Sequence, residues 1–364
     1  MTHYLYLLGI AFVSSVVSIF CVLLFSRHFG LYDTVDARKV HTGNIPRLGG
    51  VGMFLGFVIG LIVFALDTGM DNFLGVKIWN LIASCALIFV MGVWDDMRPW
   101  RARYKLMVQI LAAVIVLSAD FTFHSINFSA LRLNWNMGWM RYVITFCWII
   151  GVTNAVNLID GIDGLAGSVS AMSAFTFGLF FLQNGNTGGM FICFLLAVAI
   201  MGFLVFNLPI PKAKIFMGDG GSQFLGYMLA VLPLLPNGKG GATVSLPFAA
   251  AVLMIPIFDT FAALWRRSRE HRSFFDPDKF HLHHKLMMLG FTARGSLLIL
   301  VVFQLIIGLL IATSARIHGF LALTLLLPCT CSAFSFLPWC IYGKKKFLKN
   351  RNLLKPNNIL TVRE

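Results

Sequence analysis

Long apolar runs are the feature that most constrains this chain. A bilayer core about 30 Å thick needs roughly 20 apolar residues per spanning helix. Only 12% of the residues are charged, about half the fraction of a soluble domain. Reading the apolar runs against the polar breaks gives eleven candidate spans, at about 4–26, 50–66, 78–94, 104–119, 139–157, 165–182, 190–206, 222–236, 246–265, 296–314 and 319–341. The sequence therefore predicts an all-α polytopic membrane protein.

The spans read as one unit. We find no internal repeat and no low-complexity tract, so we expect a single integral membrane domain over residues 1–341 and a basic tail over 342–364. The first run, Tyr4 to Ser26, is long for a signal peptide and has no small-residue cleavage site before Arg27. We interpret it as a retained helix.

Basic residues indicate the orientation. With the N-terminus outside, the cytoplasmic segments are 27–49, 95–105, 158–164, 207–221, 266–295 and the tail. They hold 24 of the 29 Lys and Arg residues, against five outside. This asymmetry predicts an N-out, C-in topology. Twelve of the fifteen acids fall on the same side, which the positive-inside rule does not require, and a polar catalytic surface there would explain them.

Two other classes of site are disfavoured. The formal net charge of +14 would suggest nucleic acid in a soluble protein, but basic residues that flank spans explain it here. All seven cysteines lie inside apolar runs and none has zinc-finger spacing. We therefore expect neither a nucleic-acid partner nor a zinc site.

Adjacent carboxylates end the third predicted span. Asp95 and Asp96 are followed by the basic residues Arg98, Arg101, Arg103 and Lys105. Two acids beside an apolar helix end are costly to desolvate unless a cation, a proton or basic side chains offset their charge. A solvated helix end paired to the arginines is the alternative.

The fifth predicted span ends in a run of amides, carboxylates and glycines. Asn154, Asn157 and Asp160 share one face if the helix continues, and Asp163 follows. Gly161 and Gly164 would let the backbone approach a ligand closely. This composition favours a hard cation or a nucleotide over a simple helix-capping turn.

A third polar cluster precedes the eighth predicted span. Asn207 follows the seventh span, and Asp219 lies in the run Ile215-Phe216-Met217-Gly218-Asp219-Gly220-Gly221-Ser222. A helix start surrounded by small residues suits phosphate or a metal–phosphate complex. The simpler alternative is that Asp219 only caps the helix.

The loop at 266–295 is the longest polar segment. It holds Arg266 and Arg267, suited to forked recognition of phosphate, and His281, His283 and His284, which could bind a transition metal or donate hydrogen bonds. The surrounding carboxylates favour magnesium or manganese over zinc. A basic loop that only sets topology would leave the histidines unexplained.

Further charged residues lie on the same face. The first loop adds Lys39 and His41, and the segment Ile45-Pro46-Arg47-Leu48-Gly49-Gly50. Asp259 lies near the end of the ninth span, where it could pair with Arg266 or His271, and its role is left open.

These segments, in this order, resemble the polyprenyl-phosphate N-acetylhexosamine-1-phosphate transferase family. The shared motifs are the Asp-Asp pair, Asn-x-x-Asn-Leu-x-Asp-Gly-x-Asp-Gly, Phe-x-Gly-Asp-x-Gly-Ser and His-x-His-His, and they extend from about Arg38 to Gly290. Ile-Pro-Arg-Leu-Gly-Gly and His-x-His-His are similar to the WecA-type branch of the family. The run Glu270-His271-Arg272 departs from that pattern, which often carries a glycine there.

The resemblance implies transfer of GlcNAc-1-phosphate from UDP-GlcNAc to undecaprenyl phosphate, with release of UMP and use of Mg²⁺ or Mn²⁺, at a bacterial inner membrane. By that resemblance Asp219 and Asn157 hold the metal. Asp95, Asp96 and Lys105 serve the phosphates. The remaining candidates bind substrate: Asn154, Asp160, Gly161, Asp163, Asn207, Arg266, Arg267, His281, His283, His284, Lys39 and His41.

Several questions stay open at this point. A direct attack on the sugar-bearing phosphorus competes with a two-step route through an aspartyl-phosphate. A nucleotide-sugar or anion transporter is the rival from another class, although its polar residues would lie nearer the membrane midplane. The sequence does not distinguish GlcNAc from related sugars or from an MraY-like substrate. Nor does it choose among O-antigen, enterobacterial common antigen and teichoic acid as the pathway, or between a monomer and a homodimer.

Overall fold

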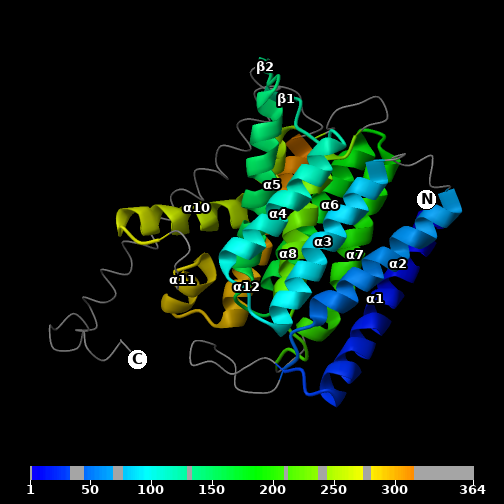
Figure 1. Cartoon of the computed structure of the whole chain (residues 1–364), viewed down its shortest axis with the longest axis vertical. Helices are drawn as coiled ribbons and strands as arrows, with labels where there is room; N and C mark the ends of the chain where they lie inside the picture. Colours follow the sequence, from blue (N-terminus) through cyan, green and yellow to red (C-terminus); the bar gives the residue numbers. More distant parts are fainter. Residues whose placement is uncertain are drawn as a thin grey trace.

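A bundle of long helices dominates the computed structural model (Figure 1). It describes residues 2–32, 45–68, 77–128, 133–208, 212–236, 244–273 and 280–314. In chain order the elements are α1 Thr2–His28, α2 Gly49–Thr68, α3 Lys77–Met97, α4 Ala102–Ser118, β1 Ser125–Phe128, β2 Leu133–Asn136, α5 Met140–Ile159, α6 Leu165–Gln183, α7 Thr187–Asn207, α8 Gly218–Val231, η3 Leu232–Leu234, α9 Leu246–Val252, α10 Met254–Arg269, α11 Leu282–Met288 and α12 Ala293–Ser314.

Seven of the described helices are long and apolar enough to cross a bilayer, or eight if the bent pair α9 and α10 counts as one span. Each of the seven falls on a predicted span, which confirms a helical, multi-pass membrane protein. The predicted spans at 104–119 and 222–236 coincide with α4, of 17 residues, and with α8, of 14 residues followed by η3. The span at 319–341 and the tail at 342–364 lie outside the described residues, so the count of eleven and the single domain stay predictions.

The predicted span at 246–265 is broken in the structure. It consists of α9 and α10, bent by 86° at the break between them. Pro256 explains the break, because proline has no N–H to donate to the carbonyl of Val252, four residues earlier. That carbonyl instead accepts a 3.0 Å hydrogen bond from Nε2 of Gln304 on α12. A buried neighbour thus satisfies the freed backbone group, as membrane depth demands.

Two smaller features were also not predicted. β1 and β2 form an antiparallel hairpin between α4 and α5, with Ser125 opposite Asn136, so the fold is not all-α in the strict sense. The loop predicted at 266–295 is partly helical, because α10 continues to Arg269 and α11 follows. Both features are short or polar. The length of apolar runs predicts membrane spans, and it does not predict hairpins or short helices in polar segments.

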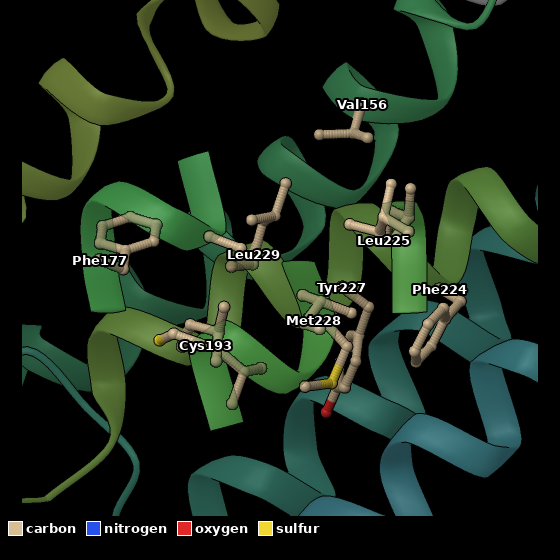
Figure 2. Packing of buried hydrophobic residues seen from close by; sticks show 14 of the residues in the cluster. Val156, Phe177, Cys193, Phe224, Leu225, Tyr227, Met228 and Leu229 are labelled. Carbon is tan, nitrogen blue, oxygen red and sulfur yellow. The ribbon is translucent and has the colours of Figure 1, made fainter. Parts of the chain in front are cut away.

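Helix α8 lies at the centre of the bundle (Figure 1), and every one of its residues except Asp219 is buried. A helix that is buried all round needs neighbours on every side. Figure 2 shows Leu225 near Val156 of α5, while Tyr227 points the other way, where its hydroxyl donates a 3.3 Å hydrogen bond to Ala112 O of α4. The one accessible residue of α8 is therefore an acid at its first turn.

Glycines let the neighbouring helices approach the backbone of α8. An added Cβ at Gly92 on α3 would lie 2.5 Å from Gly220 Cα, and one at Gly226 would lie 2.6 Å from Thr153 O on α5. Both distances are shorter than real Cβ atoms show. The side chains of these helices therefore meet around the start of α8 within hydrogen-bonding reach.

Candidate active site

Lys105 on α4 lies between two carboxylates that come from different helices. Its Nζ is 2.5 Å from Oδ2 of Asp95 on α3 and 2.8 Å from Oδ2 of Asp219 on α8. The other oxygen of Asp95 accepts a 2.7 Å hydrogen bond from the backbone N–H of Trp100. Charge-assisted hydrogen bonds of this length are among the strong ones in proteins. Three of the predicted site residues are therefore direct neighbours.

Asp96 contacts the first turn of α8 instead. Its Oδ1 accepts from Asp219 N–H at 2.8 Å and its Oδ2 from Gly220 N–H at 2.9 Å. Its side chain is only 2% exposed. Helix starts have N–H groups without helical partners, and a carboxylate suits them in both hydrogen bonding and charge. The adjacent acids thus have different surroundings: Asp95 holds Lys105, and Asp96 holds the backbone of Asp219.

Arg47 reaches the same cluster from the segment before α2. Phe216 N–H donates to Pro46 O at 2.8 Å, and Gly49 N–H donates to Phe216 O at 2.9 Å, so this segment runs along the residues before α8. Arg47 Nη2 lies 3.6 Å from Asp219 Oδ1 and 3.7 Å from Asp96 Oδ1. The sequence had placed Arg47 only on the same face, and the structure makes it the second cation of the cluster.

Asn157, predicted as a metal ligand, lies on α5 beside the start of α8. Its Nδ2 donates a 2.7 Å hydrogen bond to Ser222 Oγ, which donates in turn to Gly218 O at 3.1 Å. The amide nitrogen is therefore engaged, and the carbonyl oxygen is the atom left to accept. Carbonyl oxygen is the amide atom that binds hard cations.

Asn154, one turn earlier in α5, belongs to an amide cluster. Its Nδ2 donates to Oε1 of Gln109 on α4 at 2.8 Å, and Gln109 Nε2 donates to Oε1 of Gln223 on α8 at 3.0 Å. Gln109 and Gln223 are 3% and 2% exposed. The cluster links α4, α5 and α8. The predicted substrate contact of Asn154 stays a prediction.

The turn after α5 carries Asp160, Gly161 and Asp163. Asp160 is accessible to solvent, yet neighbouring protein atoms displace water from its carboxyl group. This desolvation, with the negative charges of Asp219 and Asp96, raises the pKa of Asp160 above its usual range. Asp163 is close enough to add to the same effect. The acids predicted for the metal and for the nucleotide therefore share one electrostatic environment.

Asn207 fixes the far end of this turn. Its Oδ1 accepts a 2.6 Å hydrogen bond from Gly164 N–H, and its Nδ2 donates to Ile215 O at 2.8 Å. The residue is 5% exposed. Its amide therefore joins two loops at the site, and its predicted contact with the nucleotide stays a prediction.

His283 on α11 packs directly on the same turn. A Cβ at Gly161 would overlap the His283 ring, so glycine is required at that position. His283 is 1% exposed, and neither ring nitrogen has a hydrogen-bond partner in the part of the chain that the structure describes. Burial, with His284 nearby, lowers the pKa of His283 to about 4. The ring of His284 lies 4.2 Å away and that of His281 6.1 Å away, centroid to centroid.

Asp259 supports this histidine cluster from α10. Its Oδ2 lies 2.9 Å from His281 Nδ1, and its Oδ1 accepts a 2.8 Å hydrogen bond from Leu282 N–H. The sequence had suggested Arg266 or His271 as its partner, whereas the structure pairs it with His281. The sequence of α10 does not predict which residues of a later segment pack against Asp259.

The remaining predicted residues are less closely tied to the cluster. Arg266 and Arg267 lie in the last turn of α10, and Arg267 is 5% exposed. Lys39 and His41 lie outside the described residues. The predicted substrate contacts of these four residues stay predictions.

A cavity of about 430 Å³ lies between α10 and α12, beside the histidine cluster. Its walls are almost entirely aliphatic and aromatic, with Asp259 and Lys285 as the charged residues among its lining. Apolar cavities of this size hold apolar ligands, oriented by a few polar groups. The site therefore has a charged side and an apolar side.

Sequence reasoning left out Gln109, Gln223 and Arg47 as site residues. The two glutamines had a usable signal, because an amide within an apolar span is costly in hydrocarbon and implies a partner. Arg47 had no such signal beyond its positive charge, because its contacts depend on how the segment before α2 pairs with the segment before α8.

The residues at the start of α8 fit a divalent cation. In the described part of the chain, no three His, Cys, Asp or Glu side chains form a metal-binding group. Magnesium, however, is commonly held by one or two carboxylates together with waters and substrate phosphates. Asp219, whose side chain is 22% exposed, and the carbonyl oxygen of Asn157 match that requirement.

Known proteins are similar in sequence to this chain. Residues 78–237 match the family model described as glycosyl transferase family 4. A probable undecaprenyl-phosphate N-acetylglucosaminyl 1-phosphate transferase of Bacillus subtilis is 32% identical over 286 residues, 79% of this chain and 76% of that protein. The undecaprenyl-phosphate alpha-N-acetylglucosaminyl 1-phosphate transferase of Salmonella typhi is 31% identical, over 79% of this chain and 78% of that protein. The Escherichia coli K12 protein of that name is 28% identical, over 76% and 74%.

The helical bundle, with its charged cluster at the start of a buried helix, defines a multi-pass membrane protein with a site suited to phosphate. The chain belongs to glycosyl transferase family 4, which confirms the resemblance drawn from its motifs.

Proposed function

We propose that this chain transfers GlcNAc-1-phosphate from UDP-GlcNAc to undecaprenyl phosphate, giving undecaprenyl-diphospho-GlcNAc and UMP. The observation that carries the proposal is the cluster at the start of α8, where Lys105 and Arg47 meet Asp95, Asp96 and Asp219. The names of the relatives supply the acceptor, undecaprenyl phosphate, and the transferred group, N-acetylglucosaminyl 1-phosphate. The motif resemblance supplies UDP as the carrier of that group. The product would initiate a lipid-linked surface glycan.

The chemistry is one displacement at phosphorus. An oxygen of the lipid phosphate forms a bond to the sugar-bearing phosphorus while the bond from that phosphorus to the UMP oxygen breaks. A phosphate monoester has a second pKa near 6 and is already mostly dianionic at pH 7, so it needs little help from a base. It does need relief from repulsion, because it approaches an anionic diphosphate.

The residues of the cluster supply that relief and the positioning. Lys105 and Arg47 are the cations that would face phosphate oxygens. Asp95 holds Lys105 in place through the 2.5 Å contact, and Asp96 holds the start of α8 through two backbone hydrogen bonds. Fixed geometry of this kind lowers the barrier by removing the need to order the reactants.

Asp219 and Asn157 are the residues that would hold Mg²⁺ or Mn²⁺. Such a cation would supply positive charge to the diphosphate oxygens of the donor. The turn at Asp160 and Asp163 and the histidine cluster lie next to this point and would receive the nucleotide sugar.

The apolar cavity between α10 and α12 supports a lipid acceptor, because its walls suit a hydrocarbon chain and the charged cluster suits a phosphate. We further propose that the charged end faces the cytoplasm, with the N-terminus outside, in the inner membrane of a bacterium. The distribution of Lys and Arg supports this orientation. A reporter that is active only in the cytoplasm should therefore be active when it is fused to the C-terminus.

The test uses purified protein in detergent with UDP-GlcNAc, undecaprenyl phosphate and Mg²⁺. We expect UMP release only when the lipid phosphate is present, and a loss of at least about 100-fold in Lys105→Met. A panel of UDP-sugars then identifies the preferred donor. UMP release without lipid would indicate a hydrolase, and lipid-independent uptake of UDP-GlcNAc into vesicles would indicate a transporter. Inversion at a chiral thiophosphate supports direct displacement, whereas retention would support the aspartyl-phosphate route.

A further inference from the structure

Asp259 on α10 is a buried carboxylate with both oxygens engaged. It is 4% exposed, and its two partners, His281 Nδ1 and Leu282 N–H, belong to one later segment of the chain. A buried carboxylate is costly unless hydrogen bonds compensate it. The two contacts, at 2.9 and 2.8 Å, therefore tie the start of α11 to α10.

The carboxylate also determines which nitrogen of His281 carries a proton. A carboxylate accepts hydrogen bonds and does not donate them, so its partner Nδ1 must be protonated. The neutral Nδ1–H tautomer and the imidazolium both satisfy Asp259, and the neutral Nε2–H tautomer does not. Because His281 is itself only 6% exposed, water offers little alternative to this bond.

His281 is connected to the nucleotide side of the site through a second ring. The rings of His281 and His283 are nearly parallel, with an interplanar angle of 5° and centroids 6.1 Å apart. His283 in turn packs on Gly161, between Asp160 and Asp163. A change in the position of His281 would therefore move His283 and the turn that carries Asp160 and Asp163.

Asp259 also lines the apolar cavity between α10 and α12, together with Leu282 and Lys285. One face of its surroundings is therefore the cavity proposed for the lipid, and the other is the histidine cluster. A rotation of α11 away from α10 would disturb both sides together.

We propose that Asp259 is a positioning residue that fixes the tautomer of His281 and the placement of α11, so that the histidine cluster is held against the turn at Gly161. The kinetic part of this inference rests on the proposed transferase function. The part that concerns the tautomer does not, and it is tested separately.

Asp259→Asn is the informative variant, because asparagine matches aspartate in shape. Its amide oxygen still accepts from Leu282 N–H, but its NH₂ group can only donate to His281 Nδ1. We expect His281 to switch to the Nε2–H tautomer, which the ¹⁵N chemical shifts of histidine-labelled protein in detergent report. His281→Gln identifies the relevant signals by their loss. Asp120→Asn is the matched control, because Asp120 pairs with Arg141 at the base of the hairpin.

The kinetic expectation is a fall of about 10-fold or more in kcat/KM for UDP-GlcNAc in Asp259→Asn, with little change in melting temperature. If Asp259 acts through His281, adding Asp259→Asn to His281→Ala should cause no further loss. Additive losses, or an unchanged tautomer in Asp259→Asn, would overturn the inference. If the wild-type protein lacks transferase activity but His281 still switches tautomer in Asp259→Asn, the proposed function is refuted and the inference is supported.

Discussion

Gly92 tests how the start of α8 is held, because α3 touches α8 at this residue. A Cβ added there would lie 2.5 Å from Gly220 Cα and 2.8 Å from Asp219 O, whereas ordinary contact begins at 3.4 Å. These are backbone atoms, which cannot rotate away as a side chain would. In Gly92→Ala the two helices must therefore separate locally by about 0.9 Å.

The magnitude follows from this separation. Overpacking costs about 1–3 kcal/mol, and alanine in place of a helical glycine returns about 0.5–1 kcal/mol, so we expect a net loss of about 0.5–2 kcal/mol. The hydrogen bonds from Asp219 N–H and Gly220 N–H to Asp96, now 2.8 and 2.9 Å, would lengthen beyond hydrogen-bonding range. A misplacement of about 1 Å in a site costs about 100-fold in turnover.

Thermal unfolding in detergent and UMP release measure the two effects. Gly151→Ala on α5 is the matched control, because an added Cβ there meets nothing within 4 Å. It should leave turnover unchanged and leave the melting temperature equal or higher. If Gly92→Ala behaves like Gly151→Ala in both assays, the close packing of α3 on α8 does not position the site.

Three further predictions follow from the charged groups. Lys105→Met leaves Asp95 and Asp219 without the cation between them, so turnover should be lost. Lys105→Arg should retain part of the turnover. Equal activity in the two variants would contradict a positional role for the ammonium group. Asp96→Ala removes the two acceptors at the start of α8 and should cost about 1–2 kcal/mol in thermal unfolding, and an unchanged melting temperature would argue against the cap. His283 stays neutral to about pH 4 when folded and titrates near 6.5 when unfolded, so its own contribution to stability should be level above about pH 7 and fall by about 2 kcal/mol between pH 7 and pH 5. His283→Gln should show a smaller fall over that interval, and an equal fall would place the acid sensitivity elsewhere.

The sequence alone identified the spans and the motifs, because both depend on local properties. The length of an apolar run decides whether a helix can cross a bilayer, and seven predicted spans lie on long helices of the structure. The order of the motifs was sufficient to recognise the family. The break in the ninth span also had a local signal in Pro256, which apolar length alone concealed.

The division of labour between Asp95 and Asp96 was decided only by the tertiary structure. Adjacent residues on a helix point in directions about 100° apart, so their partners depend on how α3 is rotated against its neighbours. That rotation is set where Gly92 meets Gly220, between segments more than a hundred residues apart in the chain. For the same reason the pairing of Asp259 with His281 could not be predicted. The sequence determined which chemical groups the site contains, and the packing of α8 among its neighbours determined which of them touch.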